Sequence, residues 1–217
     1  DVLEAMGVKI DCDPATLARC LDAAGCCHIF APAYHPGFAR LAPLRRELGI
    51  RTIFNLMGAI GSPARPHSHL LGVAENNLIM PMARALKTLG TRRAMVVHGA
   101  DNIDEISIGA PTRVAELRAD GEITEYEIKP ESLGVSRGDR RALMIDNLND
   151  AVRMLRSALD GGQGAAQDVL ALNGGVAIYI GGKANSLKEG VDAARKIIAS
   201  SRALEVIEKM RLASQAK

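Results

Sequence analysis

One stretch near the middle of the chain alternates between extended and helical character, and it constrains the fold more than any other feature. Residues 70–73 and 94–97 are short apolar runs suited to buried strands. Between them, residues 75–89 carry apolar side chains at helical spacing, and Gly90 follows as a typical helix end. Such a unit is typical of parallel sheets, whose ligands gather beyond the carboxyl ends of the strands. We therefore predict an α/β fold, a mainly parallel sheet flanked by helices, with a ligand site near residues 98–105.

Turn and capping residues predict the remaining elements. Asp13 and Pro14 form a strong helix start, because Asp13 can accept hydrogen bonds from the first turn and proline has no donor to leave unpaired. Residues 112–117 and 123–128 alternate apolar and polar side chains around Gly121, which predicts an antiparallel hairpin at the sheet edge. The other predicted elements are a short helix ending at Gly7, helices over residues 14–24, 36–48, 147–159, 165–180 and 187–212, a buried strand over residues 26–31, and an extended piece leading into a loop over residues 51–66.

Composition excludes several classes of function. The formal net charge of +2 is too small for the phosphate neutralisation that drives nucleic-acid binding, and aromatic residues make up only 3% of the chain. No apolar run approaches the roughly 20 residues that span a bilayer, and no signal-peptide pattern opens the sequence. The four cysteines lack metal-binding spacing. We interpret them as small buried apolar side chains of a protein in a reducing compartment. We expect no nucleic-acid or membrane partner and a cytoplasmic location.

The segment HGADNIDE at residues 98–105 combines a glycine turn with three carboxylates. Neighbouring carboxylates repel one another unless a cation or an arginine neutralises them, and carboxylate oxygens are ligands that Mg²⁺ accepts together with water and substrate phosphate. The residues alone leave two interpretations open, a Mg²⁺ ion bridged to a diphosphate and a solvated acidic turn. His98 is likewise either a strand-end histidine held by the backbone or a group that orients phosphate.

Several motifs, taken together and in order, resemble the anthranilate phosphoribosyltransferase family. They lie at residues 30–36 (FAPAYHP), 45–56 (RRELGIRTIFNL), 62–66 (SPARP), 97–99 (VHG), 103–107 (IDEIS), 109–112 (GAPT) and 172–173 (LN). The resemblance covers essentially the whole chain. It implies the phosphoribosyltransferase and nucleoside-phosphorylase-like fold without its N-terminal helical segment. It also implies one domain over residues 1–217, in which residues 36–66 pack against that helical domain.

The resemblance further implies a reaction and its ligands. The family transfers the phosphoribosyl group of phosphoribosyl diphosphate to the amino group of anthranilate, in tryptophan biosynthesis, with Mg²⁺ on the diphosphate. By resemblance, Asp104 and Glu105 are the Mg²⁺ ligands. No residue is implied as an acid or base, because breaking the bond to diphosphate needs mainly positioning and charge. The family also implies a homodimer formed through the helical domain.

Four positions match the family residues that bind anthranilate: His35, Arg45, Gly58 and Ala59. Arg45 suits this role because a guanidinium can meet a carboxylate with two parallel donors. Ala59 stands where the family has a proline at the anthranilate entrance, which frees the backbone and loosens that segment.

Two further departures bear on activity. Gly174 and Gly175 replace a helical alanine pair, at a cost of about 1 kcal/mol each unless something packs closely there. The family's glycine-rich phosphate loop belongs upstream of residue 1, so we expect these 217 residues alone to be inactive. The alternative to an enzyme is a truncated or divergent paralogue, a non-catalytic binding or assembly module.

Overall fold

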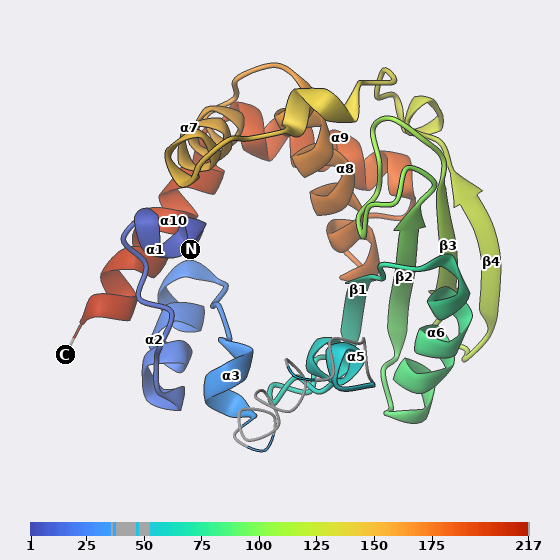
Figure 1. The fold of residues 1–217 in the computed structure, drawn as a ribbon, viewed down its shortest axis with the longest axis horizontal. Coiled ribbons are helices and arrows are strands. Elements are labelled where there is room, and N and C mark those ends of the chain that lie inside the picture. The colour runs from blue at the N-terminus through green and yellow to red at the C-terminus, as the bar shows by residue number, and fades with distance from the viewer. Residues whose placement is uncertain (36, 38–46, 48–52, 217) are drawn as a thin grey trace. The chain divides into compact units, whose positions relative to one another are not determined.

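The computed structural model describes residues 1–35, 37, 47 and 53–216, in two compact units. Unit 1 comprises residues 1–65 and 204–217, and unit 2 comprises residues 66–203. Figure 1 labels their helices and strands. The predicted helix over residues 36–48, including Arg45, lies outside the described residues apart from Gly37 and Glu47. Among the helices that are described, none has both the length and the apolar character that crossing a membrane requires.

Unit 2 contains a sheet in the order β1 (Ser68–Gly72), β2 (Arg93–Gly99), β3 (Thr112–Leu117) and β4 (Ile123–Ile128). β1 pairs with β2 in parallel, whereas β2–β3 and β3–β4 are antiparallel. The α/β class and the hairpin are confirmed, but the sheet in the described residues is mixed rather than mainly parallel. The reason is that residues 100–111, between β2 and β3, form no crossover helix, so the chain reverses beside β2.

Helices cover both faces of this sheet (Figure 1). On one face, η1 (Asn76–Leu78) and α6 (Ile79–Thr88) connect β1 to β2, and α6 packs on β2 and β3. On the other face lie α8 (Ala165–Ile180) and α9 (Leu187–Ala199). The remaining elements of unit 2 are η2 (Pro130–Leu133), η3 (Arg140–Leu143) and α7 (Leu148–Leu159), which packs on α8.

The alternation of side chains along β2 explains why this strand is buried on both faces. Met95 and Val97 belong to the core that α8 and α9 cover. Ala94 and Val96 point the opposite way, toward the face on which α6 packs. None of the four is more than 1% exposed. β2 is therefore a fixed base for the acidic segment that follows it.

α8 and α9 approach each other at two glycines. A Cβ built on Gly175 would lie 2.5 Å from the Cα of Val191, and one built on Gly190 would lie 2.2 Å from the carbonyl oxygen of Gly175. A Cβ on Gly174 would meet only the Cβ of Ala194, at an ordinary 3.8 Å. The close packing expected at this glycine pair is therefore found at Gly175, where no side chain fits between the two helices.

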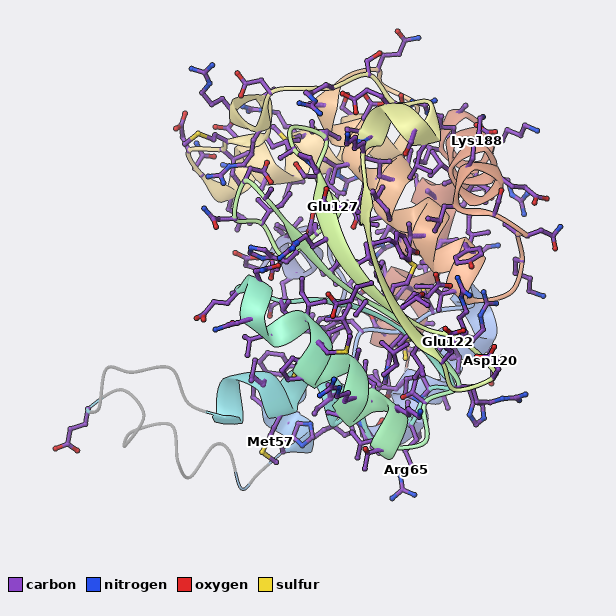
Figure 2. The ribbon with its side chains drawn as sticks, turned by 90° about the vertical axis from the view of Figure 1, so that its right-hand side faces the viewer. Met57, Arg65, Asp120, Glu122, Glu127 and Lys188 are labelled. Carbon is purple, nitrogen blue, oxygen red and sulfur yellow. The ribbon has the colours of Figure 1, made fainter. Side chains whose placement is uncertain are left out.

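The predicted hairpin is confirmed at both strands. Its turn is closed by Asp120, whose side chain accepts a hydrogen bond of 2.9 Å from the backbone of Glu122, and Gly121 supplies the positive φ of +84° that the turn requires. Figure 2 shows Asp120 and Glu122 at this end of the hairpin. Lys87 of α6 donates to the carbonyl of Gly121 at 2.7 Å. The hairpin is therefore tied to the helix beside it.

A buried carboxylate joins three elements of unit 2. Glu116 of β3 is only 6% exposed and accepts hydrogen bonds from the hydroxyls of Tyr126 at 2.9 Å and Tyr179 at 2.8 Å. Burial, reinforced by the charge of Glu116, raises the pKa of Tyr126, so its phenol stays a donor. The guanidinium of Arg93 lies 5.0 Å from the centre of the Tyr179 ring. This network fixes β3, β4 and α8 to one another.

Unit 1 contains α1 (Val2–Ala5), α2 (Pro14–Ala24), α3 (Ala31–Tyr34), α5 (Ile53–Ile60) and most of α10 (Arg202–Gln215). The start of α2 is confirmed in detail, because the side chain of Asp13 accepts from the backbone of Thr16 at 2.8 Å. The helix ends at Gly25 with a φ of +76°. A small core links α1, α2 and α10; it contains Val8, Cys20 and Met210, with Leu3, Ala24, Cys27, Ile207 and Ala213 packed around it.

Three predicted elements were wrong. Residues 26–30 form no strand and Cys26 is exposed, because an apolar run becomes a strand only where a neighbour pairs with it. Residues 53–60 form α5 rather than an extended piece and loop, since Gly61 and the prolines beyond it end the helix instead of preventing it. The long C-terminal helix is two helices, α9 and α10, separated at Ser201, whose φ is +57°.

Candidate active site

The acidic segment forms a tight turn at the carboxyl end of β2, as the sequence predicts. The backbone N–H of Gly99 donates to the carbonyl of Ile103 at 2.8 Å, and these two residues form an isolated antiparallel bridge. Asn102 turns the chain with a φ of +63°, a conformation that asparagine tolerates better than most residues. Asp104 and Glu105 follow directly, and both are exposed to solvent.

Gly72, the last residue of β1, is what allows this turn to lie against the sheet. A Cβ built on Gly72 would lie only 1.6 Å from the carbonyl oxygen of Asp104 and 2.6 Å from its carbonyl carbon. No side chain fits at residue 72 while the backbone of Asp104 crosses it. The sequence alone does not reveal this role of Gly72, because the contact joins residues far apart in the chain.

Two carboxylates in adjacent positions suit a divalent cation. Loss of solvation raises the pKa of Glu105, and the negative charge of Asp104 raises it further. A cation relieves this repulsion, and carboxylate oxygens are the hard ligands that Mg²⁺ prefers. Within the described residues, no group of three or more His, Cys, Asp or Glu side chains gathers as a metal site. An ion held by two carboxylates has room for water and substrate oxygens among its other ligands.

A second set of hydrogen bonds fixes the turn from the other side. The hydroxyl of Ser107 donates to Oδ2 of Asp101 at 2.8 Å and accepts from the backbone N–H of Gly109 at 2.9 Å and of Ala110 at 3.1 Å. Arg140 donates to the backbone carbonyl of Asp101 at 2.5 Å. Oδ2 of Asp101 is thus engaged within the turn, whereas Asp104 and Glu105 are exposed residues.

His98 has the role of a strand-end histidine held by the backbone. It is 5% exposed, and its Nδ1 donates to the carbonyl of Val73 at 2.8 Å. His69 contacts the hydroxyl of Thr91 through its own Nδ1 at 3.3 Å, and burial lowers its pKa. The His98 ring thus joins β2 to the backbone that follows β1, and the His69 ring joins β1 to the segment before β2.

The residues predicted to bind anthranilate belong to unit 1, and Asp104 and Glu105 belong to unit 2. His35 is half-buried just beyond α3, and its Cε1 lies 3.5 Å from a Cβ built on Gly61, which follows α5. Gly58 and Ala59 lie within α5, and a Cβ at Gly58 would meet nothing within 4 Å. The structure thus brings His35 beside the end of α5, whereas Arg45 lies outside the described residues.

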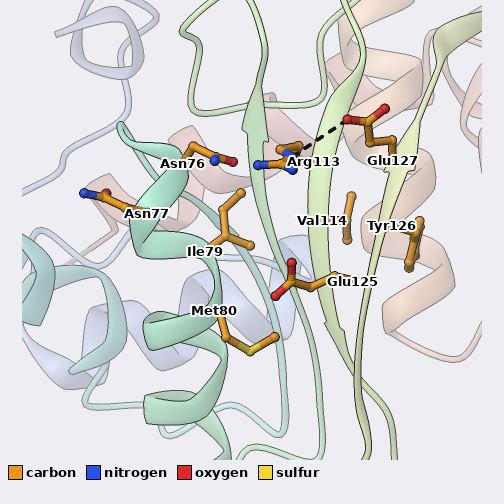
Figure 3. A pocket seen from close by; sticks show the side chains of 9 residues that line it. All are labelled: Asn76, Asn77, Ile79, Met80, Arg113, Val114, Glu125, Tyr126 and Glu127. Carbon is orange, nitrogen blue, oxygen red and sulfur yellow. Dashed lines mark ion pairs between the residues drawn. The ribbon is translucent and has the colours of Figure 1, made fainter.

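Two cavities in unit 2 differ in their relation to the acidic pair. One, of about 250 Å³, is lined by Glu105 and by apolar side chains that include Met154 and Leu155 of α7 and Val169 of α8. The other, of about 420 Å³, lies between the start of α6 and the β3–β4 hairpin. Figure 3 shows its residues, which include none of those predicted for the site, and the ion pair between Arg113 of β3 and Glu127 of β4 at 3.8 Å. The smaller cavity is therefore the one associated with the acidic turn.

Comparison with known proteins agrees with the family resemblance. The chain is 44% identical, over 218 residues and its full length, to an anthranilate phosphoribosyltransferase of Thermomicrobium roseum. Its fold matches the crystal structure of anthranilate phosphoribosyltransferase from Thermus thermophilus with a TM-score of 0.92 and 36% identity over 99% of the chain. The chain spans 63% of the first protein and 64% of the second.

A more distant structure shares the fold alone. It is the anthranilate phosphoribosyltransferase of Saccharomyces cerevisiae in complex with PRPP and Mg, with a TM-score of 0.89, 21% identity, and coverage of 98% of this chain and 61% of that one. Residues 1–204 match the family model described as "Glycosyl transferase family, a/b domain". A match over so much of the sequence, together with the shared fold, shows that the chain belongs to this glycosyl transferase family.

Proposed function

We propose that the protein transfers the phosphoribosyl group of phosphoribosyl diphosphate to the amino group of anthranilate, a step of tryptophan biosynthesis. The observation that carries this proposal is the exposed pair Asp104 and Glu105 at the end of buried β2, in a chain 44% identical to an anthranilate phosphoribosyltransferase. The names of its relatives favour this enzyme over a non-catalytic binding module.

In this proposal Asp104 and Glu105 are the residues that would hold Mg²⁺ at the diphosphate. When bound, Mg²⁺ offsets the negative charge that grows on the diphosphate as its bond to the ribose breaks. The buried strand β2 keeps the two carboxylates in place, so that they would be preorganised to hold the cation. The yeast relative in complex with PRPP and Mg supports this choice of ion and substrate.

His35, Arg45, Gly58 and Ala59 are the proposed contacts of anthranilate. The yeast relative in complex with 4-fluoroanthranilate supports an aromatic acid as the acceptor substrate. The guanidinium of Arg45 would bind the carboxylate of anthranilate. No acid or base is proposed, because the amine is already a nucleophile and needs chiefly to be held in line with the ribose.

Other features of the working protein stay predictions. They are the single domain over residues 1–217, the packing of residues 36–66 on a helical domain, a homodimer formed through that domain, and a cytoplasmic location. The last is supported by the four cysteines, all of which are free thiols.

We expect an Asp104→Asn, Glu105→Gln double variant of the natural full-length protein to lose at least about 100-fold in kcat/KM, the size typical of removing a charge-stabilising group. Formation of N-(5-phosphoribosyl)anthranilate, separated by chromatography, measures the rate. The matched control is Asp120→Asn with Glu122→Gln, an acidic pair at the exposed hairpin turn that should keep wild-type activity. Absence of product from the wild type, or full activity in the Asp104 and Glu105 variant, would contradict the proposal.

A further inference from the structure

Asn173 is a polar residue within the apolar helix α8, and its side chain is fully engaged with the segment that follows the acidic pair. Its Oδ1 accepts from the backbone N–H of Ile106 at 2.9 Å. Its Nδ2 donates to the backbone carbonyl of Ile106 at 3.2 Å and to the carbonyl of Val169, one turn earlier in α8, at 3.0 Å. Both backbone groups of Ile106 are thus bound by one carboxamide.

This arrangement requires the chemistry of an amide. A carboxamide offers an acceptor and a donor side by side, which matches the N–H and C=O of a single extended residue. An aspartate at this position would keep the acceptor, lose the donor and add a charge facing a carbonyl. A leucine has a similar volume and forms neither bond. The third bond, to Val169, orients the carboxamide so that it faces Ile106.

Ile106 directly follows Glu105, so its position sets where the two carboxylates lie. Its side chain is 0% exposed in the core, and Asn173 fixes its backbone. On the other side of the pair, the bridge between Gly99 and Ile103 fixes the start of the turn. Asp104 and Glu105 therefore stand between two anchors, of which Asn173 supplies the second.

We propose that Asn173 is a positioning residue for the cation site: through the backbone of Ile106, it holds Asp104 and Glu105 in the geometry that binds a divalent ion. The inference rests on the proposed function, since it assigns Asn173 a role at the same acidic pair. Partners that orient metal ligands from behind typically contribute 10- to 100-fold in metal affinity, so a loss of about tenfold or more is expected without Asn173.

The test is the binding of Mn²⁺ alone, followed by the electron paramagnetic resonance signal of the free ion, to the purified full chain and its variants. Asn173→Leu and Asn173→Ala should each weaken binding by about tenfold or more at a temperature where circular dichroism shows a folded protein. Leu172→Ala is the matched control, since it removes a buried side chain of the same helix without touching Ile106 through hydrogen bonds. It should lower stability and leave Mn²⁺ affinity within about twofold of the wild type.

The outcomes separate this inference from the proposed function. Wild-type affinity in a folded Asn173 variant, with binding lost in Asp104→Asn, would overturn the role of Asn173 alone. Unfolding of both Asn173 variants would also overturn it, because Asn173 would then support the whole fold rather than the acidic turn. Absence of Mn²⁺ binding in the wild type, or undiminished binding in Asp104→Asn, would instead contradict the cation site of the proposed function.

Discussion

Replacing Gly72 by alanine should destabilise the protein by about 3 kcal/mol or more and displace the acidic turn. The added Cβ would lie 1.6 Å from the carbonyl oxygen of Asp104. The obstacle is backbone rather than a flexible side chain, so either β1 or the turn must move. Because Gly72 pairs with Val97 in the sheet, moving β1 also disturbs β2.

Urea unfolding followed by circular dichroism measures the loss of stability. The Mn²⁺ affinity of the folded protein, which should fall, shows whether Asp104 has been displaced. Ser68→Ala, at the start of the same strand, is a control that adds no atoms and should change stability by less than about 1 kcal/mol. A Gly72→Ala protein as stable as the wild type would mean that the backbone of Asp104 does not pack on β1.

The second large effect is expected at Gly175, where the neighbouring glycine provides an internal comparison. Gly175→Ala places a Cβ 2.5 Å from the backbone of Val191 and should force α8 and α9 apart, at a cost of about 3 kcal/mol. Gly174→Ala adds the same methyl group one residue earlier, where it meets only Ala194 at 3.8 Å. Alanine favours the helix over glycine, so this variant should gain up to about 1 kcal/mol.

Thermal and urea unfolding should show a loss of stability for Gly175→Ala and a gain for Gly174→Ala if α8 and α9 approach each other closely at Gly175. The comparison is sharp because the two substitutions are chemically identical and share the same helix. Equal stability changes in the two variants, of either sign, would contradict a close approach of α8 and α9 at Gly175.

Local signals in the sequence predicted the local parts of the fold. Asp13 and Gly25 mark the ends of α2, and Gly121 marks the hairpin turn, because caps and turns depend on residues close together in the chain. The direction of β3 could not be predicted, since no residue in 100–111 specifies whether the chain reverses or crosses over. The break between α9 and α10 at Ser201 was not predicted either, because no glycine or proline stands at this point of the sequence.

In the candidate site, too, the local features could be predicted from the sequence and the long-range contacts could not. The turn beyond β2 and the exposure of Asp104 and Glu105 follow from an apolar strand that ends in a polar, glycine-containing segment. The residues that fix the turn were not predicted, because Gly72 and Asn173 act across long sequence distances. Asn173 did carry a signal, as a polar side chain in an apolar helix, but its partner could be found only in three dimensions.

Calorimetric titration of phosphoribosyl diphosphate into the full-length protein, with Mg²⁺ or with a chelator, tests the central claim most directly. Asp104 and Glu105 should make binding depend on Mg²⁺, so we predict tight binding by the wild type with Mg²⁺ and a loss of about tenfold or more with the chelator. The Asp104→Asn, Glu105→Gln variant should show that same weakened binding whether or not Mg²⁺ is present. Equal affinity in wild type and variant, both with Mg²⁺, would contradict the assignment of the acidic pair as the cation site.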